Sequence, residues 1–577
     1  MRALQHPSVQ PGEAALHAHS YNPEASAFHA AISGYSPERL EAIIGHAATA
    51  FGNEPYLTTA LPNGLSATLS FADVAEQSAN LARYLREDLG LKPGAVVAVQ
   101  SPNCISYVVC LLGILRAGLV LSNVNPLYTE TETRRQLRDC KAQALIGSEV
   151  FSDTIDRAVA GTGVAHVISV SLTDFFPALK RSGLDFVLRR IKKLERPLNV
   201  AHVTLRHALQ RGSKHSVPVG SYTEQLNDGR DAIFQYSGGT TGTSKGVRLS
   251  VAGLVTNIDQ FVSLSPSLAS MRGQSMLLVL PVYHVFGLFA SVIALRHGVR
   301  LVLAPSPKPL SNLKACLEKF QPTIFPGVNT LFAKLMEEPW FVANPPKLNL
   351  TISGAAALDP SIGKRWREMT GSEVIEGYGM AEATTLLTVN PADARHRPGT
   401  AGVPLPGTQV RILLDDGRFG LPGEVGEIVA KGPQLMAGYL HRPEETAAAF
   451  RDGWMRTGDI GVLDDEGYLK IVDRAKDMVL VGGFNVFPAE VDEVLNACPG
   501  VLEAASVGIK KENSEEELVA FVVRRDPGLD EASVLQFCGQ QLTGYKRPRK
   551  VHFVEELPKS PIGKILRREL PFLAQRV

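Results

Sequence analysis

The 577-residue sequence lacks paired cysteines, a net charge of one sign and a signal-like apolar segment near its start. Its cysteines form no CxxC pair, which argues against a zinc site and against a dense disulfide framework. Lys and Arg number 59 and Asp and Glu number 58, so the formal net charge of +1 argues against a general nucleic-acid binder. We expect a protein of the reducing cytoplasm, with residues 1–34 as a flexible leader.

Membrane-spanning character is also scarce. One run, residues 276–295, carries no formal charge over 20 positions, which is long enough to cross a bilayer. Pro281, His284 and Gly287 interrupt it, so we expect a strand, a turn at Pro281 and a buried helix from about Phe286 instead. With 45% apolar and 20% charged residues, the composition is that of a globular protein with several cores.

The hydrophobic pattern alternates between strand-like and helix-like segments over the first 340 residues. Residues 71–90 show helical spacing and precede the apolar run 95–99. Similar units recur, which predicts an α/β fold with parallel-rich sheets flanked by helices. We expect them at 105–122, 143–160, 276–295, 299–320 and 323–338.

The pattern changes twice in the last third of the chain. After about residue 400, short strands separated by Gly, Asp and Pro turns predict a small antiparallel-rich subdomain. After about residue 477, strands and two helices predict a small α+β unit. We therefore expect a large N-terminal body over 35–473 and a small, mobile C-terminal domain over 474–577, with the polar run 473–477 between them.

Residues 180–196 hold seven basic and two acidic side chains, with Phe186, Val187, Ile191 and Leu194 at roughly helical spacing. Two interpretations stay open for this segment. A basic amphipathic helix can lie on an anionic membrane surface, and it can equally be a solvated surface helix.

The strongest local motif is a loop rich in glycine and hydroxyl side chains after a predicted strand at 232–236. Glycines let a backbone approach an anion, hydroxyls add donors, and Lys245 adds a positive charge, so the loop predicts a phosphate site. It is not a Walker A loop, because Ser244 stands where that motif needs Gly. The residues are Ser237, Gly238, Gly239, Thr240, Thr241, Gly242, Thr243, Ser244, Lys245 and Gly246.

This loop resembles the phosphate-binding signature of the adenylate-forming superfamily, which includes acyl-CoA synthetases, peptide-synthetase adenylation domains and luciferases. Further blocks resemble that superfamily in the same order: Ser353-Gly354-Ala355-Ala356, GYGMAE at 377–382, Thr457-Gly458-Asp459, DRAKD at 473–477, VGGFNV at 481–486 and PKSPIGK at 558–564. Runs at 123–128, 281–284, 327–332 and 467–474 are similar to bacterial long-chain fatty acyl-CoA synthetases.

The resemblance implies a reaction in which ATP activates a carboxylate to an acyl-adenylate and a thiol then takes the acyl group. Lys564 is expected to bridge the carboxylate and the α-phosphate, Glu382 to bind Mg²⁺ together with Thr240, and His284 to line the carboxylate end of the acyl pocket. Lys476 is the expected hinge of a domain rotation between the two steps. The remaining expected ATP and AMP contacts are Gly354, Ala355, Ala356, Gly377, Tyr378, Gly379, Asp459 and Arg474, and the expected coenzyme A contacts are Gly482, Gly483, Lys546 and Arg547.

One departure from the family pattern is Ala381, where the family has Thr. The resemblance gives that hydroxyl a hydrogen bond to the α-phosphate, so its loss lowers the expected activity unless Thr384 or Thr385 replaces it.

We interpret the chain as a long- or medium-chain fatty acyl-CoA ligase that uses ATP, Mg²⁺ and coenzyme A. Two alternatives stay open: an adenylate-forming ligase that serves a carrier protein or a non-fatty acid, and a catalytically weak protein that binds fatty acids or nucleotides. Peripheral membrane association through residues 180–196 and a homodimer are open as well. No nucleic-acid partner is expected.

Overall fold

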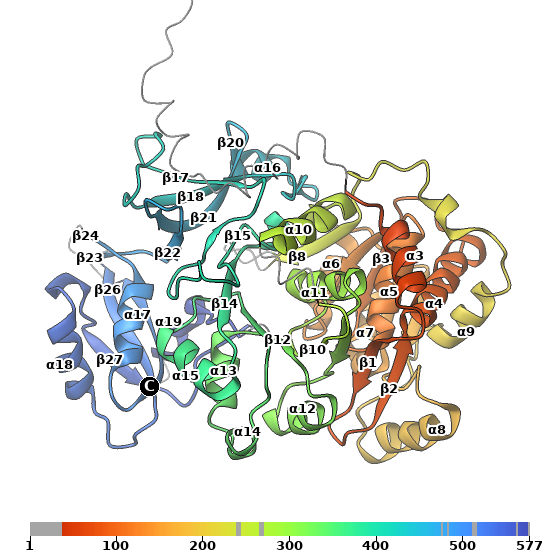
Figure 1. Ribbon diagram of the computed structural model, residues 1–577, viewed down its shortest axis with the longest axis horizontal. Coiled ribbons are helices and arrows are strands. Elements are labelled where there is room, and N and C mark those ends of the chain that lie inside the picture. The colour runs from red at the N-terminus through yellow and green to blue at the C-terminus, as the bar shows by residue number, and fades with distance from the viewer. Residues whose placement is uncertain are drawn as a thin grey trace, which may run out of the picture.

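The computed structural model describes residues 37–237, 244–264, 271–474, 477–481, 484–510, 516–560 and 563–574. The expected leader, residues 1–34, lies outside them. The described chain forms a large body with two mostly parallel sheets, an antiparallel sheet above one end of the body, and a C-terminal α+β unit at its side (Figure 1). The predicted α/β class with a smaller C-terminal unit is thus confirmed.

One large sheet of the body has the order β16-β15-β14-β13-β12-β10-β11-β1-β2. The pairings from β14 through β1 are parallel, whereas β2, β15 and β16 pair antiparallel at the two ends. The bounds are β1 Pro55–Ala60, β2 Ser66–Ser70, β10 Ser275–Leu278, β11 Arg300–Leu303, β12 Ile324–Gly327, β13 Leu350–Ser353, β14 Val374–Tyr378, β15 Thr388–Val389 and β16 Val403–Pro404.

The second large sheet has the order β19-β9-β8-β4-β3-β5-β6-β7. Strands β8, β4, β3, β5, β6 and β7 are parallel, and β9 and β19 add antiparallel pairs at one edge. The bounds are β3 Val96–Gln100, β4 Val120–Asn123, β5 Ala144–Ser148, β6 His166–Val170, β7 Val203–Thr204, β8 Ile233–Ser237, β9 Lys245–Leu249 and β19 Gly438–Tyr439.

Helices α5, α10 and α11 form part of the core that joins the two sheets. Every residue of α5 (Ile105–Arg116) is buried, and α11 (Val285–Arg296) is buried except for Phe286 and Arg296. Such helices are apolar all round because no face meets water. Helix α10 spans Val251–Leu264. The other α-helices of the body are α3 Leu40–Ala50, α4 Phe71–Arg83, α6 Glu130–Asp139, α7 Ser152–Val159, α8 Ala178–Phe186, α9 Leu205–Gly212, α12 Lys314–Phe320, α13 Asn329–Leu335, α14 Pro339–Ala343 and α15 Pro360–Thr370.

The charge-free run 276–295 becomes strand β10, a turn and helix α11, as predicted. A Cβ on Gly287 would lie 2.3 Å from the carbonyl oxygen of Pro281, so the helix can pack against the preceding turn only through glycine. In the part of the chain that the structure describes, no helix is long and apolar enough to cross a membrane.

The antiparallel sheet follows the body in sequence and contains the predicted short strands. Its order is β17-β18-β21-β20, with β22 paired to β21. The bounds are β17 Gln409–Leu413, β18 Gly426–Lys431, α16 Pro443–Ala449, β20 Phe450–Arg451, β21 Trp454–Leu463 and β22 Leu469–Arg474.

The C-terminal unit lies on the opposite side of the body from α3, α4 and α9 (Figure 1). It touches the body at several points: the Asp473 carboxylate accepts a 2.7 Å hydrogen bond from the Ala489 amide, and Arg525 lies 3.6 Å from Glu337. Its elements are β23 Val479–Val481, β24 Phe484–Val486, α17 Pro488–Ala497, β25 Val501–Lys510, β26 Glu516–Arg524, α18 Glu531–Gln541, β27 Lys550–Phe553 and α19 Leu570–Ala574.

The basic segment 180–196 is helical over only part of its length. Helix α8 continues into a π-helical turn at Val187–Ile191, and the helical structure ends there. Leu184 and Leu188 face the core, whereas Phe186 and Ile191 are each 61% exposed.

Candidate active site

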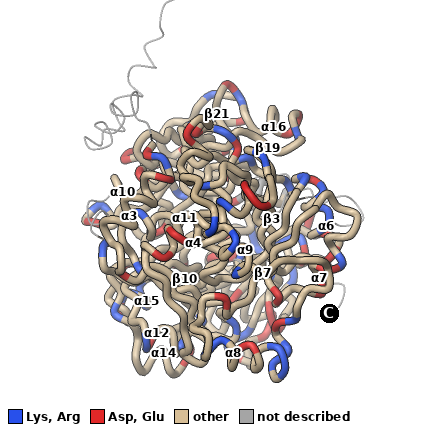
Figure 2. Tube along the Cα trace, turned by 90° about the vertical axis from the view of Figure 1, so that its right-hand side faces the viewer, with Lys and Arg blue, Asp and Glu red and all other residues tan. Residues whose placement is uncertain are grey.

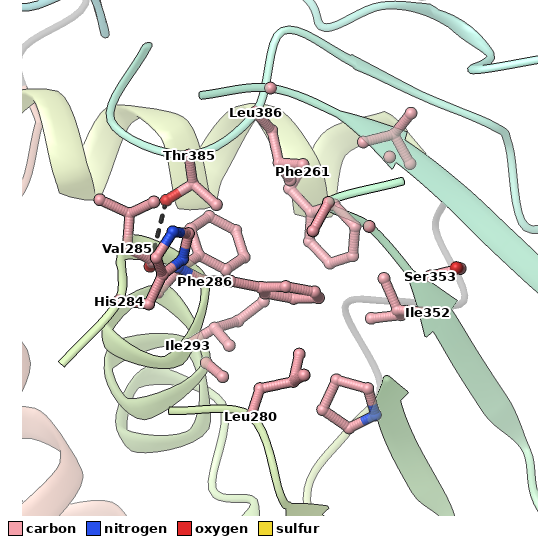
Figure 3. Close-up of a pocket in the computed structure, with 18 of the residues that line it drawn as sticks. Phe261, Leu280, His284, Val285, Phe286, Ile293, Ile352, Ser353, Thr385 and Leu386 are labelled. Atoms are coloured by element: carbon pink, nitrogen blue, oxygen red, sulfur yellow. Dashed lines mark hydrogen bonds between the residues drawn. The ribbon is translucent and has the colours of Figure 1, made fainter. Parts of the chain in front are cut away.

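An apolar cavity lies where helices α10 and α11 meet the edge formed by β12, β13 and β14 (Figure 3). The empty space within it, including open solvent at its mouth, is about 960 Å³. Among the described residues that line it, none is Asp, Glu, Lys or Arg, so it suits an apolar ligand. Its walls include Phe261, Met271, Met276, Leu280, Val285, Phe286, Phe289, Ile293, Leu350, Ile352 and Leu386.

His284 lines this cavity from the position just before α11. Its imidazole Nδ1 accepts a long, 3.5 Å hydrogen bond from the Phe286 amide, so the side chain caps the helix it precedes. Burial and, to a smaller extent, the positive charge of Lys564 together lower the pKa of His284 to about 4. The imidazole is therefore neutral at physiological pH.

Lys564 reaches this region from the C-terminal unit. Its amide donates to Ser560 Oγ at 3.2 Å, and the Ser560 amide donates to its carbonyl oxygen at 2.8 Å, which closes a tight loop. The preceding Gly563 has φ +76°, and a Cβ there would lie 2.9 Å from Thr330 Oγ1 and 3.1 Å from Val328 Cγ2. Because Val328 lines the cavity, this loop is seated against the cavity wall, which brings together the predicted Lys564 and His284.

The Ser353–Ala356 segment follows β13 and runs beside the end of β14. A Cβ on Gly354 would lie 3.2 Å from the Phe286 ring, so glycine permits this segment to pass the aromatic wall. Ala355 has φ +68°, a left-handed conformation that costs energy for a residue with a side chain. Ala355 and Ala356 are exposed, and together with Gly354 they form a shelf of small residues.

Tyr378 and Asp459 lie together although different sheets carry them. The Tyr378 hydroxyl donates a 2.7 Å hydrogen bond to Asp459 Oδ2, and both side chains are buried. Asp459 stands opposite Arg474 in the register of β21 and β22. A Cβ on Gly379 would lie 1.8 Å from the Thr385 carbonyl oxygen, so only glycine fits between these segments.

Glu382 is buried in a short 3₁₀ turn, and its Oε1 accepts a 2.9 Å hydrogen bond from the Tyr439 hydroxyl. Sequence reasoning missed Tyr439, because its partner is 57 residues away and no local pattern marks it. The described residues contain no group of three or more His, Cys, Asp or Glu that could hold a metal alone.

The two hydroxyls next to Ala381 are committed to backbone oxygens. Thr384 Oγ1 donates to the Gln434 carbonyl at 2.6 Å, and Thr385 Oγ1 lies 2.7 Å from the Thr384 carbonyl and 3.4 Å from that of Val285 (Figure 3). Both are buried. The structure therefore gives no support to the idea that either replaces the missing threonine hydroxyl.

Lys245 forms an ion pair with Glu445 of α16, and the Lys245 Nζ lies 5.2 Å from the centroid of the Tyr439 ring. Ser244 lies 3.5 Å from the Tyr128 hydroxyl, measured between the two side-chain oxygens. The rest of the predicted phosphate loop, Gly238 to Thr243, lies outside the described residues, as do the side chains of Ser237 and Arg474.

The predicted hinge and thiol-channel residues Lys476, Gly482 and Gly483 also lie outside the described residues. Lys546 and Arg547 are described. Lys546 is paired with Glu490 at 2.7 and 2.8 Å, and Arg547 Nε donates to the Leu542 carbonyl at 2.8 Å. Their role toward coenzyme A stays a prediction.

Comparison with known families finds two matches. The profile of the AMP-binding enzyme family matches residues 45–440, and that of the AMP-binding enzyme C-terminal domain matches residues 490–564.

Curated relatives match along most of the chain. A long-chain-fatty-acid–CoA ligase of Salmonella typhimurium is 38% identical over 542 residues, covering 93% of this chain and 95% of the relative. One from Escherichia coli O6:H1 is 40% identical over 506 residues, covering 87% and 89%.

Solved structures share the fold. ATP-bound MatB from Rhodopseudomonas palustris has a TM-score of 0.78 at 28% identity, covering 93% of this chain and 99% of MatB. The anthranilate CoA ligase AuaEII, with anthranoyl-AMP, has a TM-score of 0.81 at 24% identity, covering 95% and 99%.

Proposed function

This chain belongs to the AMP-binding enzyme family, and on that premise we propose that it is a long- or medium-chain fatty acyl-CoA ligase. It activates a fatty acid with ATP to an acyl-adenylate and pyrophosphate, and then forms the coenzyme A thioester. The observation that carries this proposal is the apolar cavity whose lining includes His284, close enough to Lys564 for its charge to lower the pKa of His284.

The first step joins two anions. A carboxylate oxygen attacks the α-phosphorus of ATP, pyrophosphate leaves, and negative charge accumulates on the phosphoryl oxygens at the transition state. Positioning and electrostatic stabilisation must supply most of the catalysis. In our proposal Lys564 provides the positive charge between carboxylate and phosphate, and the neutral His284 bounds the carboxylate end of the cavity without adding a second charge.

The nucleotide lies, in our proposal, along the shelf formed by Gly354, Ala355 and Ala356, with its base against Tyr378. The Asp459 carboxylate accepts hydrogen bonds from the ribose hydroxyls, and the Tyr378–Asp459 hydrogen bond orients that carboxylate. Gly377 and Gly379 keep the backbone close to the nucleotide, and Arg474 lies on the strand beside Asp459. The loop Ser237–Lys245 holds the β- and γ-phosphates.

Mg²⁺ is proposed to bind through Glu382, with Thr240 as a further oxygen ligand. Proteins usually hold this ion through one or two carboxylates together with substrate phosphates, so the single buried carboxylate of Glu382 fits a metal that enters with the nucleotide. When bound, the ion would neutralise phosphate charge.

For the second step we propose that the C-terminal domain, residues 474–577, rotates about Lys476, withdraws Lys564 and brings Gly482 and Gly483 to the thiol channel. Hinges of this kind change φ and ψ at a few residues near the end of an element. Lys546 and Arg547 are proposed to bind the phosphates of coenzyme A, which requires Lys546 to exchange its Glu490 partner for phosphate.

The test separates the half-reactions. The full chain should release pyrophosphate with palmitate and ATP, and should release AMP only when coenzyme A is added. Lys564→Ala should abolish adenylate formation while thioester formation from supplied acyl-adenylate is largely retained. Arg568→Ala, which removes an exposed positive charge four residues further on, is the matched control. Equal loss of both steps in Lys564→Ala would refute the assignment.

A second proposal concerns the surface formed by α8 and the residues after it, 178–196. Leu179 is 93% exposed, Phe186 and Ile191 are 61% exposed and Leu194 is 47% exposed. These apolar side chains stand beside exposed Lys180, Arg190, Lys192 and Lys193. Figure 2 places α8 at the lower edge of the molecule, with Lys and Arg positions beside it.

The opposite face of this segment is anchored to the body. Arg189 pairs with Glu149 at 2.6 Å, and the buried Glu195 accepts a 2.6 Å hydrogen bond from the Leu172 amide. The exposed apolar residues are thus held outward rather than left by a loose segment. Apolar side chains among basic ones suit an anionic bilayer surface, so we propose peripheral membrane association here.

A further inference from the structure

The Lys245–Glu445 ion pair joins the end of the phosphate loop to a helix that the motifs do not include. The Lys245 side chain is 21% exposed and that of Glu445 is 39% exposed. The Tyr439 ring lies under the same ammonium, which adds a cation–π contact. The Glu445 carboxylate and the face of the Tyr439 ring thus contact the Lys245 ammonium, which in our proposed function binds phosphate.

Local structure fixes Glu445 in this place. Strand β19 pairs with β9, with Tyr439 opposite Val247. Helix α16 begins a few residues after Tyr439, and this pairing therefore brings its start close to Lys245 in space. Thr446 ties the turn together: its Oγ1 accepts from the Tyr439 amide at 2.9 Å and donates to the Arg442 carbonyl at 2.7 Å. Gly438 has φ +136°, and a Cβ there would lie 2.6 Å from Thr446 Cγ2, so the turn is closely packed.

The same turn also contacts Glu382, the carboxylate that our proposed function assigns to Mg²⁺. The Tyr439 hydroxyl donates to Glu382, while the Tyr439 ring lies beside the Lys245 ammonium. One short segment therefore touches both the proposed phosphate-binding lysine and the proposed metal-binding carboxylate.

We propose that Glu445 is a positioning residue that occupies the Lys245 ammonium in place of a phosphate. It gives up this partner when the β- and γ-phosphates of ATP bind, and takes it back when pyrophosphate leaves. The inference rests on the proposed function, because it takes Lys245 as a ligand of those phosphates.

The consequence is a competition for one ammonium group. A contact that stabilises the free protein and is broken when a ligand binds weakens the binding of that ligand by the same factor. Partly exposed ion pairs change an equilibrium by roughly 1.5- to 5-fold. Glu445 should therefore weaken the binding of ATP and of pyrophosphate to that extent. It should leave AMP binding unaffected, because AMP has neither the β- nor the γ-phosphate.

The experiment measures equilibrium binding of ATP, pyrophosphate and AMP to the full chain by calorimetry, without fatty acid and at fixed Mg²⁺. We expect Glu445→Gln to bind ATP and pyrophosphate about two- to five-fold more tightly and AMP unchanged. Glu444→Gln removes the same charge from the same helix turn, at an exposed position, and should match the wild type. In turnover, the KM for ATP should fall without a rise in kcat.

Three results would overturn the inference: equal binding by the two variants, an equal shift for AMP, or a shift that persists in a Lys245→Met background. In that background Glu445 has no ammonium to hold, so Glu445→Gln should change nothing. If the wild type binds neither ATP nor pyrophosphate, the proposed function is overturned as well. That result is distinct from the three results that overturn the inference alone.

Discussion

The Tyr378 hydroxyl donates a 2.7 Å hydrogen bond to Asp459 Oδ2 across 81 residues of sequence. The Asp459 amide in turn donates to Thr457 Oγ1 at 3.1 Å, and Thr457 Oγ1 donates to the Ile428 carbonyl at 2.7 Å. This chain of bonds fixes the carboxylate between β14 and the antiparallel sheet. The nucleotide site that we propose thus depends on the junction of two sheets, rather than on one loop.

Tyr378→Phe should weaken AMP binding by about ten-fold or more. A hydrogen bond to a charged group contributes roughly 1.5–3 kcal/mol, and its loss leaves Asp459 less well oriented while the aromatic ring is kept. Calorimetric titration with AMP measures the effect. Tyr222→Phe removes a phenol–carboxylate bond of 2.6 Å to Glu87, away from the site, and should leave AMP binding unchanged. Unaltered AMP affinity in Tyr378→Phe would contradict the orienting role.

His284 should stay neutral across the physiological range, because burial and then the Lys564 charge lower its pKa to about 4. A folded-state pKa below the unfolded value near 6.5 means that stability is lost as pH falls from about 6.5 toward 4. His284→Gln should therefore lose less unfolding free energy than the wild type over that interval, as measured by denaturant unfolding.

The activity profile gives a second reading of the same group. Between pH 6 and 8 the adenylation rates of the wild type and His284→Gln should run parallel, whatever their absolute difference, because no proton leaves or joins His284 there. An inflection present only in the wild type would show that the imidazole titrates during the reaction, contrary to the expectation.

Much of the fold follows from short-range pattern. The helix predicted at 71–90 appears as α4 followed by a π-helical turn at Tyr84–Asp88, and Ser70 and Asp73 form a reciprocal cap at its start. The short strands after residue 400 and the α+β unit after residue 477 also appear where they are predicted, because apolar alternation and turn residues bound them.

The contacts within the site required the structure. Motif order predicts that Tyr378, Glu382 and Asp459 belong to one site, but the contacts of Tyr439 and Glu445 could not be found from local sequence. Both lie beside Lys245 because β9 pairs with β19, two strands almost 200 residues apart in the chain. Such register is a property of the whole sheet, and no hydrophobic period or turn signal specifies it.

Ala381→Thr should raise the adenylation rate by about ten- to a hundred-fold, which corresponds to a charged hydrogen bond of roughly 1.5–3 kcal/mol. The reason is that Thr384 and Thr385 already direct their hydroxyls to backbone carbonyls. Single-turnover formation of pyrophosphate measures the rate. Ala381→Val adds the same volume without the hydroxyl and should bring no gain; equal gains in both variants would point to packing rather than hydrogen bonding.

Vesicle binding should depend on the exposed side chains of residues 178–196. In flotation with vesicles containing phosphatidylglycerol, the wild type should rise with the lipid. The double variant Leu179→Ser with Phe186→Ser should largely remain in the lipid-free bottom fraction. Leu421→Ser with Val425→Ser removes two exposed apolar side chains elsewhere, 54% and 48% exposed, and is the matched control. Both apolar insertion and charge attraction are expected to contribute, so binding should weaken as salt rises and on neutral phosphatidylcholine. If the two double variants float equally, the exposed residues of 178–196 are an ordinary solvated surface, and residues of another face must account for any binding observed.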